Sequence, residues 1–89
     1  MNPELIELRD QINQLDEQLA ELFEQRMALS EKIGHLKRQQ GLQAIDPARE
    51  QAIVERLMAH GGASARYLPR LYDTIFALSR EHQKQSRED

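Results

Sequence analysis

Hydrophobic residues recur at alternating spacings of three and four along the first part of the chain. Ten positions form this seam: Leu5, Leu8, Ile12, Leu15, Leu19, Leu22, Arg26, Leu29, Ile33 and Leu36. Nine of them are aliphatic, and neither glycine nor proline interrupts the seam before Gly34. This a/d heptad pattern predicts one helix from Leu5 to about Gln39. The exception is Arg26, a charge that is costly to bury unless something pairs with it.

The ends of two helices are marked by capping residues. Asn2 and Asp46 each precede a proline, and an N-capping side chain followed by proline favours a helix start. Gly41 is placed to end the first helix, and Gly61 with Gly62 to end the second. The apolar residues of the second helix form a modest stripe: Ala52, Ile53, Leu57 and Met58.

A third helix is predicted to open near Ser64. Pro69 must lie within its first turn, because a proline deeper in a helix breaks the hydrogen-bond ladder. Its expected buried face consists of Leu68, Leu71, Tyr72, Ile75, Phe76 and Leu78. The polar tail from Lys84 to Asp89 is expected to fray. No segment has the pattern of a strand, so the predicted fold is all-α, with one long, one short and one medium helix.

The length of the first helix predicts a dimer. The chain has 89 residues, which suits a single domain over residues 1–89. A helix of ~35 residues is ~52 Å long, whereas a compact chain of this size has a radius of gyration of about 12 Å. The helix would therefore overhang its own globule and expose its apolar seam. A second copy on a two-fold axis is the common solution, so we expect an obligate homodimer.

Composition excludes several classes of protein. The chain has no cysteine, and its three histidines have no ligand spacing, so we expect no metal site. The N-terminal residues lack the basic and apolar regions of a signal peptide, and no apolar run is long enough to span a membrane. A soluble cytoplasmic protein is therefore expected. The net charge of −3 argues against nucleic acid as a partner.

Basic residues on the first helix suggest an anion site. Arg26 and Lys37 are eleven residues apart, which places them ~16 Å apart and ~20° round the helix, on one face. Arg9 lies ~25 Å from Arg26 and roughly 100° round, so it reaches that site only from a partner chain. Alternatively, Arg26 is a register device of a coiled coil and the other two are solvated charges.

Two polar groups lie on the other helices. Asp46, Arg49 and Glu50 share one face at the start of the second helix, and Ser79 and Gln83 are one turn apart on the third. Their simpler interpretations are an N-cap with a solvated ion pair, and a satisfied serine beside a surface glutamine. Neither group identifies a function alone.

Taken together, these residues resemble the all-helical chorismate mutases. The resemblance rests on LRDQINQLDEQLAELFEQR, then Lys37, DPARE and SREHQ, in that order, and it covers residues 5 to 83. It implies an intertwined homodimer of three-helix protomers with two active sites. It also implies that Arg9 crosses to the partner's site. The other residues of each site would come from a single chain: Arg26, Lys37, Asp46, Arg49, Glu50, Ser79 and Gln83.

The resemblance also implies a reaction, the rearrangement of chorismate to prephenate in the shikimate pathway, on the branch to phenylalanine and tyrosine. This isomerase needs no cofactor, nucleophile or general base, because no proton is transferred. Arg26, the partner's Arg9 and Ser79 would bind the carboxylates. Lys37 and Gln83 would donate to the ether oxygen. Glu50 and the backbone near Asp46 would hold the ring hydroxyl. Arg49 would be a support that orients the acidic groups and adds positive potential.

Two other functions fit parts of the pattern. An isochorismate-pyruvate lyase resembles the mutases in fold and also acts at an ether oxygen, and assays on both substrates separate the two. A non-enzymatic helical dimerisation module explains the seam but leaves Arg26 and the polar groups as coincidences.

Overall fold

The computed structural model describes residues 2–88, which form three α-helices and one short 3-10 helix. Helix α1 spans Pro3–Gln39, α2 spans Pro47–His60 and α3 spans Leu68–Glu88, with the 3-10 helix η1 at Ala65–Tyr67. No strand occurs among the described residues, so the all-α fold is confirmed. None of these helices combines the length and apolar character needed to cross a membrane.

The helix ends lie where the capping residues predicted them. The Asn2 side chain accepts hydrogen bonds from the backbone N–H groups of Glu4 and Leu5, and that of Asp46 accepts one from Arg49. Gly41 adopts a φ of 70°, the left-handed conformation that glycine enters without strain. Local side-chain and backbone chemistry therefore sets these boundaries.

The start and end of α3 refine two expectations. The α-helix begins at Leu68 and not near Ser64, because the 3-10 turn η1 precedes it, and Pro69 is its second residue. This position confirms the prediction, since the missing N–H of proline costs nothing in the first turn. The predicted fraying of the tail from Lys84 is not seen as far as Glu88, where α3 ends, and Asp89 lies outside the described residues.

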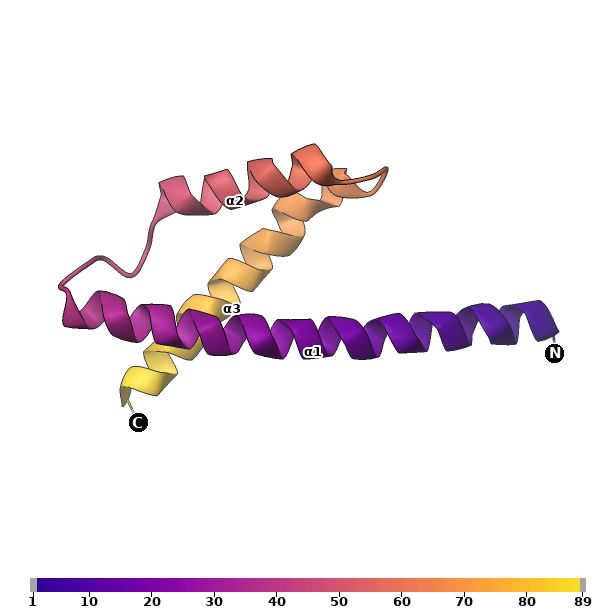
Figure 1. Ribbon diagram of the computed structural model, residues 1–89, viewed down its shortest axis with the longest axis horizontal. Coiled ribbons are helices and arrows are strands. Elements are labelled where there is room, and N and C mark those ends of the chain that lie inside the picture. Colours follow the sequence, from indigo (N-terminus) through magenta and orange to yellow (C-terminus); the bar gives the residue numbers. More distant parts are fainter. Residues whose placement is uncertain (1, 89) are drawn as a thin grey trace.

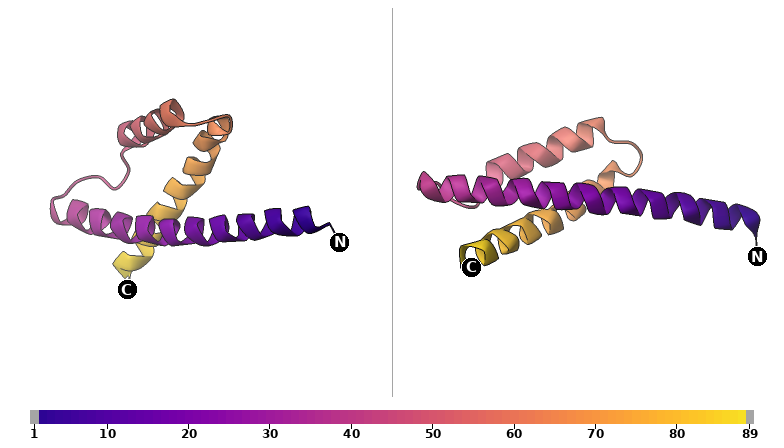
Figure 2. Two further views of the ribbon diagram at one scale, coloured as in Figure 1. Left: turned by 45° about the vertical axis from the view of Figure 1, so that its right-hand side comes forward. Right: turned by 60° about the horizontal axis from the view of Figure 1, so that its bottom comes forward.

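The helices are arranged as an open frame (Figure 1). Helix α3 packs across the C-terminal half of α1 and against α2, whereas α1 and α2 do not pack against each other within residues 2–88. The N-terminal half of α1 projects beyond both other helices in every view (Figure 2). The extents are 57 × 32 × 15 Å and the radius of gyration is 16.8 Å, well above the ~12 Å of a compact chain of this length. The predicted overhang of α1 is confirmed.

The interior of a single chain is small. Phe76 and Ser79 on α3 are each only 6% exposed, and Gly34 is buried on α1. The nine aliphatic residues of the α1 seam are all exposed, and Leu19 retains 64% of its accessible surface. An apolar stripe of this length on an isolated chain marks an interaction surface.

The predicted buried face of α3 is partly wrong. Leu71 and Leu78 are 53% and 39% exposed, although the pattern placed them inside. Helices α1 and α2 both pack on the flank that carries Phe76 and Ser79, and no described element covers the opposite flank. On α2, Val54 is half-buried, whereas Ala52 and Met58 of the predicted stripe are exposed.

Candidate active site

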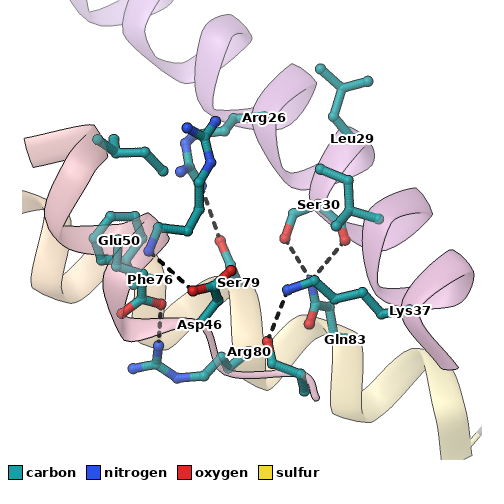
Figure 3. A pocket seen from close by; sticks show the side chains of 14 residues that line it. Arg26, Leu29, Ser30, Lys37, Asp46, Glu50, Phe76, Ser79, Arg80 and Gln83 are labelled. Atoms are coloured by element: carbon teal, nitrogen blue, oxygen red, sulfur yellow. Dashed lines mark hydrogen bonds and ion pairs between the residues drawn. The ribbon is translucent and has the colours of Figure 1, made fainter. Parts of the chain in front are cut away.

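A cavity of about 470 Å³ lies between the C-terminal half of α1, the start of α2 and the C-terminal half of α3 (Figure 3). Its lining includes seven of the eight predicted site residues: Arg26, Lys37, Asp46, Arg49, Glu50, Ser79 and Gln83. These residues come from three helices and the connector that follows α1. Residues far apart in the sequence therefore meet at one site, as the family resemblance implied.

Arg9 is the predicted site residue that does not line this cavity. It lies on the N-terminal half of α1, about 25 Å along the helix axis from Arg26, and it is exposed. Because α1 is straight and unbroken, no motion within the helix brings the two arginines of one chain together. Its participation requires a second chain.

Arg26 is held by neutral groups. Its Nη1 donates a hydrogen bond to Ser79 Oγ at 3.3 Å, and its guanidinium carbon lies 5.6 Å from the ring centroids of both Tyr72 and Phe76. Within residues 2–88 it forms no ion pair with a carboxylate. The rings and the hydroxyl orient the guanidinium without neutralising it, which leaves its charge available to an anionic ligand.

Ser79 supports Arg26 from the centre of the structure. Its hydroxyl accepts from Arg26 and donates to Met27 Sδ at 3.7 Å. The hydroxyl hydrogen is therefore directed at a weak sulfur acceptor, which a carboxylate oxygen would displace readily. In this arrangement the main role of Ser79 is to fix the guanidinium of Arg26.

Lys37 is a second cation of the cavity that forms no ion pair with a carboxylate of the described residues. Its Nζ donates to the carbonyl of Ala44 at 3.4 Å, across the connector between α1 and α2. This single long hydrogen bond leaves two ammonium hydrogens for a ligand, since lysine carries three donors. Arg26 and Lys37 line the same cavity, as their spacing on α1 predicted.

Arg80 is a functional candidate that the sequence analysis missed. Its Nη1 lies 2.6 Å from Glu50 Oε2, in an ion pair that joins α3 to α2. The role of orienting this acid was expected of Arg49, whose side chain forms no hydrogen bond or ion pair with a described residue. The available signal was the spacing of Arg80 and Gln83, which puts both on one face of α3.

Ser30 was also missed. The amide nitrogen of Gln83 donates to the Ser30 carbonyl at 2.7 Å and to its hydroxyl at 2.9 Å. A signal existed here too, because the steps from Arg26 to Ser30, Gly34 and Lys37 are four, four and three residues. This spacing places all four on one side of α1.

The cavity concentrates positive charge in a chain whose net charge is −3. Four cationic side chains and two carboxylates line it, and both carboxylates are engaged, Asp46 as the cap of α2 and Glu50 with Arg80. No histidine or cysteine of the described chain is among the lining residues. The arrangement suits binding of a small polyanion and stabilisation of developing negative charge, without proton transfer to a titrating base.

Comparison with known families identifies this arrangement. The model of the family described as chorismate mutase type II matches residues 8–84, which include every predicted site residue. The chain therefore belongs to this family. A comparison with curated protein sequences finds no match.

Proposed function

We propose that this member of the type II chorismate mutase family rearranges chorismate to prephenate, on the branch to phenylalanine and tyrosine. The observation that carries the proposal is the pair of unneutralised cations, Arg26 and Lys37, in one cavity with Gln83. The substrate is a dicarboxylate and its rearrangement is a [3,3] shift without proton transfer. The site matches this need, since it offers fixed donors and positive charge.

Catalysis would come from restraint and electrostatics. Arg26 binds one carboxylate with its planar fork, already oriented by Ser79 and the two aromatic rings. Holding the substrate in its folded conformer makes the two reacting carbons neighbours before the reaction starts. Lys37 and Gln83 donate to the ether oxygen, where negative charge grows as the carbon–oxygen bond breaks.

The ring hydroxyl of the substrate would be held at the α2 side of the cavity. The Glu50 carboxylate accepts a hydrogen bond from this hydroxyl, while the ion pair with Arg80 keeps the carboxylate in place. The backbone around Asp46, at the α2 N-terminus, borders the same region. Arg49 contributes positive potential at the cavity rim.

We further propose that the active form is a homodimer in which the partner's Arg9 completes the site. The exposed seam of α1 supports this, because its leucines are more than 40% exposed in one chain and need an apolar partner surface. The α1 helix of a second chain would cover this seam. It would also bring that chain's Arg9 to the cavity of the first chain. The second substrate carboxylate would then meet a guanidinium that one chain cannot supply.

Mixing two inactive variants tests this arrangement. We expect Arg9→Ala and Arg26→Lys homodimers to lose activity, each at both sites. A heterodimer of the two has one site with both arginines intact, so random reassortment should restore about a quarter of wild-type activity. The measurement is chorismate turnover after the two proteins are unfolded and refolded together. Mixtures that stay as inactive as the separate proteins would exclude a shared site.

The acid dependence of a Gln83→Glu variant tests the ether-oxygen contact. The wild-type amide is neutral and donates at every pH, so its contribution should not change through neutrality. A glutamate with an ordinary pKa of about 4.3 donates only when protonated, so the variant should gain activity as the pH falls towards 4.5. The measurement is kcat/KM between pH 4.5 and 8. A flat profile in Gln83→Glu would contradict the assigned role.

The direct test of function is the loss of chorismate absorbance when purified protein is added. Prephenate formation without release of pyruvate is the expected outcome. Turnover of isochorismate with pyruvate release would identify a lyase instead. Failure of a chorismate transition-state analogue to raise the thermal midpoint would favour the non-enzymatic module.

A further inference from the structure

Gln83 lies in a recess on α1 that is built by two residues one turn apart. Ser30 binds its amide through both the carbonyl and the hydroxyl, at 2.7 Å and 2.9 Å. Gly34, the next residue on that side of α1, is buried directly beneath the Gln83 side chain. Figure 3 shows the two bonds from Gln83 to Ser30 at the edge of the cavity.

Gly34 has no conformational reason to be glycine. It lies inside α1 with an ordinary negative φ, at a position where alanine is a much better helix former. A Cβ at this position would lie 2.8 Å from Gln83 Cδ and 3.0 Å from its Cγ. Both distances are below normal carbon–carbon contact. The missing side chain therefore makes room for Gln83 to lie against the helix.

Ser30 determines which way the amide faces. Its carbonyl oxygen can only accept, so the Gln83 atom 2.7 Å away must be the nitrogen. The hydroxyl then accepts from the same amide group. Without these contacts, the Gln83 side chain could rotate about its three side-chain bonds, and its amide could take either orientation. Ser30 thus fixes the orientation of the Gln83 amide, and Gly34 allows the rest of the Gln83 side chain to lie against α1.

We propose that Ser30 and Gly34 are positioning residues for Gln83, which together hold its amide donor ready at the wall of the cavity. The inference rests on the proposed function, in which Gln83 donates to the reacting ether oxygen. The bond to the Ser30 carbonyl anchors one amide hydrogen. The bond to the hydroxyl keeps the second in place until a ligand oxygen replaces it, because a hydroxyl can rotate away whereas a helix carbonyl cannot.

Gly34→Ala tests the recess. We expect kcat to fall at least tenfold with little change in KM, because the displaced donor acts mainly on charge that develops in the transition state. The helix itself should not be weakened, since alanine replaces glycine in a helix interior. The matched control is Gly62→Ala, where an added Cβ meets nothing within 4 Å, and it should leave activity unchanged. Wild-type kcat in Gly34→Ala would overturn the proposal.

Ser30→Ala tests the hydroxyl separately from the backbone carbonyl. We expect kcat to fall about fivefold, the rate equivalent of one net hydrogen bond. Ser64→Ala is the matched control, because the Ser64 side chain makes no capping hydrogen bond. A Ser30→Ala variant as fast as wild type, or faster, would show that the hydroxyl does not position Gln83.

Double variants with Gln83→Ala separate positioning from a general structural role. In that background, Ser30→Ala and Gly34→Ala should no longer lower the remaining activity, because no donor is left to misplace. Gly34→Ala should also raise the thermal midpoint more in this background than in wild type, because the added methyl group then has room. Additive losses of activity, or equal thermal shifts in both backgrounds, would overturn the proposal. Absence of activity in wild type would instead reject the proposed function, and the thermal comparison would still test the recess.

Discussion

Replacing Lys37 with alanine should lower kcat by two or more orders of magnitude while the fold is retained. Loss of one donor that stabilises developing charge costs about 3–4 kcal/mol in the transition state. The structural cost is small, because the only hydrogen bond of the ammonium to a described residue is the 3.4 Å contact with the Ala44 carbonyl. Steady-state kinetics with purified protein measure the effect, and circular dichroism verifies the helices.

Lys32→Ala is the matched control for this experiment. Lys32 is an exposed lysine on the same helix, and it does not line the cavity. We expect this control to keep wild-type kcat and KM. Near-normal turnover in Lys37→Ala would remove the ether-oxygen contact from the mechanism, and equal losses in both variants would point to a nonspecific effect of charge on α1.

Substitution of Arg26 should have an effect as large as that of Lys37, and it should weaken ligand binding as well as lower turnover. We expect Arg26→Lys to lower kcat/KM at least a hundredfold, although it keeps the charge. An ammonium neither presents the bidentate fork that a carboxylate matches nor lies against the rings of Tyr72 and Phe76 as the planar guanidinium does. A dianionic transition-state analogue should accordingly raise the thermal midpoint of the variant much less than that of wild type.

Arg26→Lys is more informative than Arg26→Ala for this purpose. Truncation to alanine would also remove packing against the two rings and the bond to Ser79 Oγ, so a loss of activity could reflect loss of fold. Arg56→Lys, at an exposed position on α2, is the control and should bind the analogue normally. An Arg26→Lys variant that binds it as tightly as wild type would show that the carboxylate does not meet this guanidinium.

The helices could be predicted from the sequence because their causes are local. The caps at Asn2 and Asp46 act on backbone groups two or three residues away, and the left-handed turn at Gly41 is set by its own φ. The face shared by Arg26 and Lys37 follows from helical repeat alone. Such features need no knowledge of how the helices pack.

The set of cavity residues was predicted less completely. Spacing placed seven residues in three separate groups, and only the resemblance to a family united them. Arg80 and Ser30 were missed because their importance depends on partners 30 and 53 residues away, Glu50 and Gln83. The sequence around Ser30 and Arg80 does not differ from that around a serine or an arginine that only contacts solvent. Gly34 was noted only as the first break in the seam.

By itself, then, the sequence determined the helices, their ends and the faces that carry charge, since those depend on contacts within a turn or two. Only the tertiary structure decided what meets across the cavity. The crossing of α3 over α1 brings Gln83 onto Ser30 and Gly34, and it brings Ser79 and two aromatic rings against Arg26. The packing of α2 on α3 pairs Glu50 with Arg80 rather than with the neighbouring Arg49. Helix packing selects one partner among several that local spacing allows, and that selection is a long-range property of the fold.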